Sequence, residues 1–261
     1  MPTLSLTQAA LCLVPAAIVV WIIKFWSLNA GEASYGLARM VFQLVLVGHA
    51  LTFVVATEDN FLTLGVLVVM LLFAAWIALR PLTRRNPRQF IGVLLGMCVG
   101  AVFTVAFIFV VVLGIQPLQI PLLLIPLAGM TFAGAMNTTS LALERFENEV
   151  VQGTSIRQAR AIAYRAALIP TINSLFAVGL VSMPGTMTGQ IISGVPPHIA
   201  ARYQILVMGM MFGASGIASA CTLGWVGKYR SSAVNRRPEN VTQIDGTIVL
   251  GRVSVKQEKK L

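Results

Sequence analysis

Sulfur and amide side chains that could bind a metal ion are concentrated in the second half of the chain. Met130, Met136 and Asn137 lie in one apolar stretch, and Met183 and Met187 lie in another. Methionine thioethers bind soft metal ions, whereas oxygen ligands suit harder ones. Methionine also fills irregular gaps in packed cores without any ligand. The residue types therefore allow a metal pathway and, about equally, plain packing.

A proline–glycine segment contains the last of these methionines and interrupts the helical pattern. Pro184 and Gly185 cannot continue an ordinary helix, and Gly189 and Gly194 add further breaks. The segment is still apolar, so we expect a broken or re-entrant element at residues 184–194, near the outer face of a membrane. Irregular backbone survives at membrane depth only where it is buried in protein or lines water. We therefore predict that this segment forms a gate.

Pro170 lies inside another apolar stretch and is followed closely by Asn173. A proline inside a helix frees a carbonyl one turn earlier and bends the helix. That carbonyl and the Asn173 amide either line a pathway or pair with each other. The full set of candidates for a substrate pathway or gate is Met130, Met136, Asn137, Asn173, Met183, Pro184, Gly185, Met187, Thr188, Gly189 and Gln190.

The sequence lacks familiar patterns of catalytic and metal-binding residues. Cys12, Cys98 and Cys221 are scattered without pairing or ligand spacing, and neither His49 nor His198 has a second ligand nearby in the sequence. There is no P-loop, GxSxG or HExxH pattern. We expect no catalytic residue and no cofactor bound by this chain, and the metal ligands stay unassigned. Any nucleotide hydrolysis must come from a partner chain.

The stretch Glu144–Arg165 alternates charged and apolar residues, unlike the apolar stretches on either side of it. Ser155 and Gln158 have the spacing of a capping box that opens a helix, and Gly153 would end a helix arriving from the preceding stretch. We expect a short amphipathic helix between two membrane spans. Such a helix lies on the membrane, docks on a soluble partner or merely connects. The local pattern does not choose among these.

Seven apolar stretches approach or reach the length of about 20 residues that crosses a bilayer as a helix. The hydrophobic fraction of 57% and the charged fraction of 11% exclude an ordinary soluble domain. The predicted fold class is an all-α integral membrane protein with about seven transmembrane helices. The stretches are Ala9–Trp26, Gly36–Thr57, Phe61–Leu79, Phe90–Leu113, Pro121–Leu143, Ala166–Met183 and Tyr203–Val226.

The positive charges predict an orientation for these spans. If the N-terminus is outside, 18 of the 19 Lys and Arg residues lie on the inner side or flank it, and Arg202 is the exception. Short loops rich in Lys and Arg stay in the cytoplasm. The first apolar stretch has no positively charged start, so we do not interpret it as a cleavable signal peptide. We predict that the N-terminus is out and the C-terminus in, across a plasma membrane or bacterial inner membrane.

Composition divides the chain near Gly227. Residues 1–227 form the predicted transmembrane domain, and residues 228–261 read as a basic, largely disordered cytoplasmic tail. A net charge of +10 would suggest nucleic acid in a soluble protein. Here the charge lies in loops and the tail, so we expect membrane lipid as a partner and no nucleic acid.

Small residues recur at helical spacing in two of the spans. Gly92, Gly96 and Gly100 lie four residues apart in the fourth span, and Gly209 and Gly213 begin a similar stripe in the seventh. Small residues let the backbones of membrane helices approach closely. Packing within one subunit is the usual role, and a dimer interface is the alternative for one of the stripes.

Five segments, in order, resemble the FetB-type permeases of ABC exporters, a family that includes bacterial iron exporters and plant aluminium-tolerance half-transporters. The resemblance covers about residues 36–226. The Pro-Gly-x-Met-Thr-Gly-Gln element followed by Tyr-Gln is its most specific part. The segments are Arg39–Gly48, Gly129–Met136, Ala166–Thr171, Met183–Gly194 and Ala201–Gln204.

The resemblance implies a permease that works with a separate ATP-hydrolysing subunit on the cytoplasmic side. By the same resemblance, residues 153–159 match the family's element for coupling to that ATPase. The coupling residues implied are Gly153, Thr154, Ser155, Arg157, Gln158 and Ala159. This favours the docking role for the inner helix, with ATP reaching the complex through the partner.

Three features depart from the family pattern. The segment from Leu141 to Arg165 is shorter than in the family, Gly134 replaces an asparagine, and Thr186 stands where bacterial relatives usually carry methionine. The first change alters the expected docking geometry. The other two remove one oxygen and one sulfur that could bind a metal.

The sequence therefore predicts the permease subunit of an ABC transporter, an exporter of metal ions such as iron. Two permeases and two ATPases make the simplest closed assembly, because two-fold symmetry is the commonest. An ABC permease for a non-metal solute is one alternative. A stand-alone channel or secondary carrier is another, although no acidic residue lies inside a predicted span and Arg39 is the only candidate relay. A membrane scaffold that recruits a partner through residues 228–261 is the third.

Overall fold

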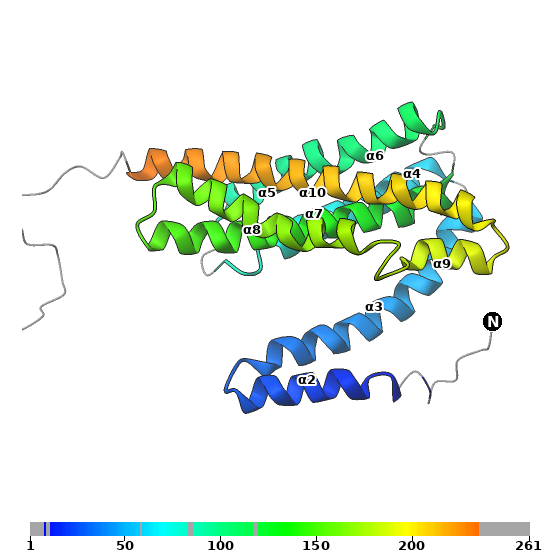
Figure 1. The fold of residues 1–261 in the computed structure, drawn as a ribbon, viewed down its shortest axis with the longest axis horizontal. Coiled ribbons are helices and arrows are strands. Elements are labelled where there is room, and N and C mark those ends of the chain that lie inside the picture. The colour runs from blue at the N-terminus through cyan, green and yellow to red at the C-terminus, as the bar shows by residue number, and fades with distance from the viewer. Residues whose placement is uncertain (1–7, 9–10, 58, 83–85, 117–119, 235–261) are drawn as a thin grey trace, which may run out of the picture. The chain divides into compact units, whose positions relative to one another are not determined.

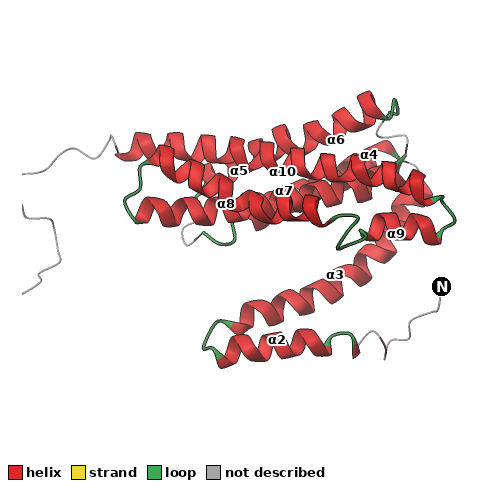
Figure 2. Cartoon of the chain, in the orientation of Figure 1, coloured by secondary structure: helices red, strands yellow, loops and turns green. Residues whose placement is uncertain are grey.

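Each predicted apolar stretch overlaps at least one helix, although residues 178–183 of the sixth stretch form a turn (Figures 1 and 2). The computed structural model describes residues 8, 11–57, 59–82, 86–116 and 120–234, with the backbone alone for residues 49–57 and 231–234. In chain order the elements are α2 (Val14–Phe25), α3 (Ala30–Thr57), α4 (Asn60–Ala78), α5 (Pro87–Met97), the π-helical turn η1 (Cys98–Val102), α6 (Phe103–Phe107), the π-helical turn η2 (Ile108–Val112), α7 (Pro121–Val151), α8 (Ile156–Ala177), α9 (Gly185–Ile192) and α10 (Pro197–Val234).

Four described helical runs are long and apolar enough to cross a membrane. They are α4, the continuous run Pro87–Val112, α7, and residues 197–230 of α10, while α2 is apolar but shorter. This confirms the all-α membrane class. Helix α3 contains the second predicted span, and α8 covers residues 166–177 of the sixth but ends before its predicted end at Met183. A total of seven spans and the orientation stay predictions.

The inner segment differs from its prediction, because no separate short helix forms between two spans. Helix α7 continues past Leu143 to Val151, and α8 runs unbroken from Ile156 through Pro170 to Ala177. The extension of α7 is supported by pairs one turn apart, in which Arg145 contacts Glu149 and the Asn148 amide donates to Glu144. The predicted connector is therefore the tip of a long helical hairpin.

The seventh span also continues beyond its predicted end. Helix α10 runs to Val234, past the proposed boundary at Gly227. The first residues of the predicted tail are thus helical, and residues 235–261 lie outside the described residues.

Contacts divide the chain into two units, Met1–Phe73 with Val105–Met130, and Ala74–Thr104 with Thr131–Leu261. In the first unit α2 packs on α3, and the rings of Trp21 and Phe25 stack at 5.5 Å. Many large apolar side chains of α2 and α3 are exposed, which is expected of helices that face lipid.

Helix α10 is the centre of the second unit, where it contacts α5, η1, α8 and α9. The contact with α5 and η1 is made by the glycine stripe of the fourth span. A Cβ on Gly92 would collide with the Trp225 ring, and one on Gly96 would lie 2.7 Å from the Ala218 carbonyl oxygen. These glycines let the two backbones meet. Packing within one subunit is therefore confirmed for this stripe.

The stripe on α10 is different. A Cβ on Gly209 or Gly213 would meet no atom within 4 Å. These two glycines therefore leave open space beside α10, and the dimer interpretation of this stripe stays a prediction.

Candidate functional site

A tight turn joins α7 to α8 at one end of the second unit. Gly153 adopts a φ of +85°, a left-handed conformation that glycine enters without strain. The Ser155 hydroxyl then accepts a hydrogen bond from the Gln158 backbone N–H, which caps α8. The Gln158 side chain accepts from the Ser155 hydroxyl at 2.7 Å. The predicted helix end and the Ser155 N-cap are confirmed, but the predicted capping box is incomplete, because the Gln158 side chain bonds the Ser155 hydroxyl in place of the Ser155 backbone N–H.

Glu149 holds the turn from the side of α7. Its carboxylate is buried, and it accepts from the Arg145 guanidinium at 2.6 Å and from the Thr154 hydroxyl at 2.9 Å. The Thr154 backbone N–H also donates to the Glu149 carbonyl at 3.1 Å. Because a buried carboxylate is costly without partners, this set of bonds ties the position of Thr154 to α7.

The hairpin is fixed to the C-terminal end of α10 by two contacts distant in sequence. Glu147 of α7 forms an ion pair with Arg230, and the Arg160 guanidinium donates to the Gly224 carbonyl at 3.2 Å. A Cβ on Gly227 would overlap that guanidinium, so glycine makes room for Arg160. The hairpin and the end of α10 therefore form one packed surface.

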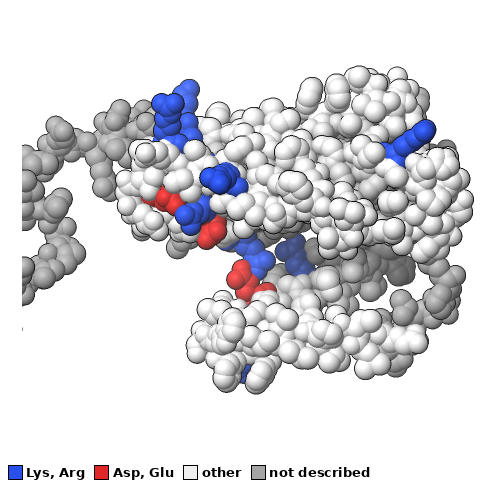
Figure 3. Space-filling model, viewed as in Figure 1, with Lys and Arg blue, Asp and Glu red and all other residues white. Residues whose placement is uncertain are grey.

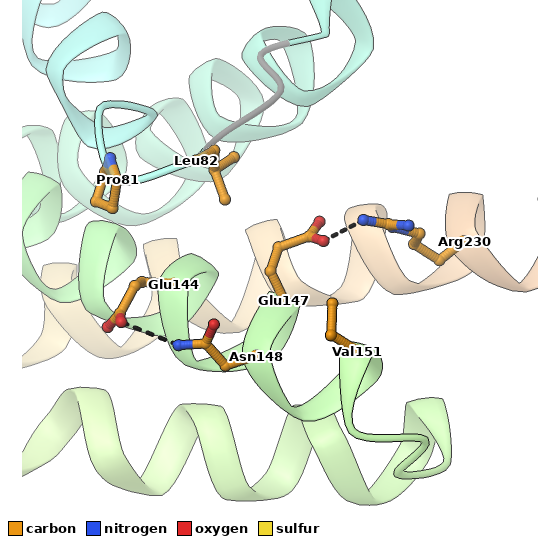
Figure 4. Close-up of a pocket in the computed structure, with 7 residues that line it drawn as sticks. All are labelled: Pro81, Leu82, Glu144, Glu147, Asn148, Val151 and Arg230. Atoms are coloured by element: carbon orange, nitrogen blue, oxygen red, sulfur yellow. Dashed lines mark hydrogen bonds and ion pairs between the residues drawn. The ribbon is translucent and has the colours of Figure 1, made fainter. Parts of the chain in front are cut away.

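A pocket of about 250 Å³ opens beside the ion pair (Figure 4). Glu147 and Arg230 face each other on one side of it, and Asn148 donates to Glu144 on the other. Its lining residues are Pro81, Leu82, Glu144, Glu147, Asn148, Val151 and Arg230. Val151, at the end of α7, is 83% exposed, so an apolar side chain faces solvent beside the turn.

The six predicted coupling residues lie together at this tip. Gly153, Ser155, Arg157 and Gln158 are exposed, Thr154 is half-buried, and Ala159 is buried beneath them. On the face shown in Figure 3, charged side chains of the second unit gather around the end where the hairpin turns. The tip is thus a largely polar, exposed surface that is supported by the contacts of Glu149 and by the contacts of the hairpin with α10.

The predicted gate lies at the opposite end of α10. The chain turns at Gly179 with a φ of +84° and again at Gly194 with a φ of +93°, and α9 occupies the eight residues Gly185–Ile192 between them. Pro184 precedes the first helical residue. The predicted breaks at Pro184 and at Gly194 are confirmed, but the predicted break at Gly189 is wrong, because Gly189 lies inside the short helix α9.

One hydrogen bond between side chains joins α9 to α10. The Thr186 hydroxyl donates to the Gln204 Oε1 at 2.6 Å, and Gln204 is 5% exposed. Gln190, one turn further along α9, has a buried Oε1 that finds no hydrogen-bond partner among the residues that the structure describes. The sequence did not predict this contact of Gln204, because no local pattern connects residues 186 and 204.

The structure separates several of the other predicted pathway residues. Asn137 on α7, Asn173 on α8 and Met183 are exposed, while Met187, Thr188, Gly189 and Gln190 are half-buried on α9. Met136 is half-buried on α7, and Met130 belongs to the first unit. The contact between α7 and α8 is made by their neighbours, since the hydroxyls of Thr138 and Thr171 lie 3.4 Å apart. The described residues contain no group of three or more His, Cys, Asp or Glu able to hold a metal.

The two ends of the second unit are about one bilayer apart. Gln204 anchors α9, and Gly224 anchors the hairpin, 20 residues later on the same helix. At 1.5 Å per residue this separation is about 30 Å, the thickness of a hydrocarbon core. The α9 contact and the hairpin contact therefore fit opposite faces of one membrane.

Comparison with known proteins is consistent with this architecture. Residues 6–230 match the model of the "Uncharacterised protein family (UPF0014)". The chain is 35% identical to "UPF0014 membrane protein slr1647" of Synechocystis over 75% of this chain and 81% of that protein. It is 33% identical to "Probable iron export permease protein FetB" of Escherichia coli, over 80% and 85% respectively.

A plant protein, "Protein ALUMINUM SENSITIVE 3" of Arabidopsis thaliana, is 30% identical over 81% of each chain. No solved structure shows significant similarity. Family match and relatives cover most of the chain, the hairpin and α9 included. The chain is therefore a member of the UPF0014 family, to which the FetB-type permeases belong.

Proposed function

We propose that this chain is the membrane-spanning permease subunit of an ABC transporter that exports metal ions such as iron. A separate ATPase subunit docks on the hairpin tip and hydrolyses ATP, while this chain binds no cofactor and catalyses no reaction. The relative from E. coli is named a probable iron export permease, which supports transport of a metal in this chain.

The observation that carries the proposal is the position of the hairpin tip relative to α9. The tip is polar, exposed and braced by the Glu147–Arg230 ion pair, and α9 lies about 30 Å away along α10. A transporter driven by a soluble ATPase needs a docking surface on one face of the membrane and a gate on the other.

The charge pattern supports placing the hairpin tip in the cytoplasm. Arg157, Arg160 and Arg165 follow the turn on α8, and Lys228 and Arg230 lie at the same end of α10. Short segments rich in Lys and Arg stay on the cytoplasmic side. The N-terminus is then outside, and the protein sits in a plasma membrane or bacterial inner membrane.

In the proposed cycle, closure of the ATPase subunits pushes the hairpin tip, and α7 and α8 move as one lever because Gly153 and Ser155 keep their turn compact. Movement relative to α10 breaks the bond between Thr186 and Gln204, which frees α9 to open outward, as alternating access requires. Two copies of the permease and two ATPases complete the assembly.

The metal ion is the substrate and passes α9. Met187 is half-buried on α9, next to the half-buried Thr188, and Met183 precedes the helix. A thioether and hydroxyl oxygens along one path bind a metal loosely, which suits release better than a closed ligand cage would.

Reconstitution tests the proposal. Vesicles holding the permease and its ATPase subunit should take up iron(II) into their lumen when ATP is added outside, since an exporter moves substrate away from the ATPase side. The uptake should require both ATP and the ATPase subunit. Equal iron(II) flux from the permease alone would contradict the proposal and favour a channel or secondary carrier.

A further inference from the structure

A second pocket lies between the beginning of α5 and the end of α10, and no step of the proposed transport cycle uses it. Its volume is about 320 Å³, which is within the range of small-ligand sites. The lining residues are Asn86, Arg88, Gln89, Trp225, Val226, Tyr229 and Arg230. All belong to the second unit.

The lining of this pocket is positively charged. It contains two guanidinium groups, those of Arg88 and Arg230, and no carboxylate among its lining residues, although Arg230 is also paired with Glu147 outside the lining. The Arg88 guanidinium lies 4.9 Å from the centre of the Tyr229 ring, which holds it in place without neutralising its charge. Guanidinium groups bind phosphate oxygens in pairs, so the pocket is suited to an anion of that kind.

The pocket has an aromatic wall that is fixed by the backbone of α5. The Trp225 ring N–H donates to the Arg88 carbonyl at 3.3 Å, and both Trp225 and Tyr229 are about two-fifths exposed. Val226, which is 2% exposed, closes the pocket from the side of α10. Tryptophan and tyrosine with one polar and one apolar edge are typical of the headgroup layer of a membrane.

The position along α10 matches that layer. The 20 residues from Gln204 to Gly224 span about 30 Å, and Trp225 and Tyr229 follow directly. The pocket therefore opens where a hydrocarbon core ends and headgroups begin. Basic pockets between membrane helices at this depth bind the headgroups of acidic lipids.

We propose that this pocket binds the phosphate headgroup of an anionic phospholipid, held by Arg88 and Arg230 and flanked by Trp225 and Tyr229. Arg230 is shared, because it also forms the ion pair with Glu147 of the hairpin. A bound headgroup competes with Glu147 for the Arg230 guanidinium and so changes the strength of the contact between α10 and the hairpin. The inference rests on the membrane position of α10, and metal transport plays no part in it.

Native mass spectrometry of the full chain in detergent tests the site with phosphatidylglycerol and phosphatidylcholine as probes. We expect retention of phosphatidylglycerol over phosphatidylcholine. Arg88→Gln and Arg230→Gln should each weaken that retention by roughly fivefold, the contribution of one basic side chain near an anionic headgroup. Glu147→Gln should raise it above the wild-type level, because it releases Arg230 from its ion pair.

Arg202→Gln is the matched control, since Arg202 is an exposed arginine at the other end of α10. It should leave retention unchanged, and an equal loss in this variant would overturn the site. Unchanged retention in Arg88→Gln, which breaks no ion pair within the described part of the chain, would overturn it as well. Displacement of the lipid by millimolar inorganic phosphate would assign the pocket to a free anion instead. Since no ATPase or metal is present, failure here leaves the proposed transport function untouched.

Discussion

Charge reversal at Arg157 should abolish most of the metal-stimulated ATPase activity of the complex while leaving the permease folded. Arg157 is exposed in the first turn of α8, at the tip that we propose docks on the ATPase. Loss of one hot-spot residue at a protein interface removes about 2 kcal/mol of binding free energy. The metal-stimulated rate of ATP hydrolysis should therefore fall roughly 30-fold. The measurement is metal-stimulated ATP hydrolysis by the co-purified complex, with the basal rate of the isolated ATPase as the reference.

The Arg157→Glu variant separates docking from folding. A glutamate in the first turn of a helix interacts favourably with the helix dipole, by about 0.3–1 kcal/mol, so thermal stability should hold or rise. Arg202→Glu at the far end of α10 is the matched control and should keep stimulation. Deletion of residues 153–159 is the more drastic version and should abolish stimulation completely. Full stimulation in Arg157→Glu and in the deletion would refute the docking role of the tip.

Replacing Gly100 with alanine should destabilise the second unit more than the same replacement at any other glycine of that unit. A Cβ on Gly100 would lie 2.8 Å from both the Ala214 carbonyl oxygen and the Ala218 Cα. These are backbone atoms of α10 that cannot turn aside as a side chain can. Overpacking of this kind costs about 3 kcal/mol, which lowers the melting temperature by roughly 6 °C or more.

Gly213→Ala provides the comparison, because the same methyl group on α10 would meet no atom within 4 Å. Alanine is the better helix former by about 1 kcal/mol, so this variant should melt at the same temperature or slightly higher. Thermal unfolding of both variants in detergent, followed by size-exclusion chromatography, measures the difference. Equal melting temperatures would show that η1 and α10 do not pack closely in the membrane.

Local sequence signals predicted the turns and helix ends well. Gly153 and Ser155 were sufficient to place the end of α7 and the cap of α8, because positive φ and hydroxyl capping depend on a few adjacent residues. The Pro184–Gly185 pair likewise placed the beginning of α9. The lengths of the apolar stretches predicted where the helices lie, but they did not establish how many of these helices cross the membrane.

Contacts distant in sequence could not be predicted in this way. The pairs Glu147–Arg230 and Arg160–Gly224 join residues more than 60 positions apart, and no periodicity connects them. The continuity of α7 and α8 with the membrane spans was also missed, since the alternating charges of Glu144–Arg165 were interpreted as a separate short amphipathic helix. A charged helix can leave the membrane without ending, and the bonds of Glu149 show what stabilises it there.

Side-specific labelling tests the orientation on which the transport cycle depends. The background would be a chain with Cys12, Cys98 and Cys221 replaced by serine, since all three are free thiols. Single cysteines would then replace the exposed Gln152 at the hairpin turn and the exposed Ser193 after α9. In intact cells a membrane-impermeant maleimide should label Ser193→Cys at once and Gln152→Cys only after permeabilisation. Labelling of Gln152→Cys from outside would place the hairpin where no ATPase can reach it and contradict the account.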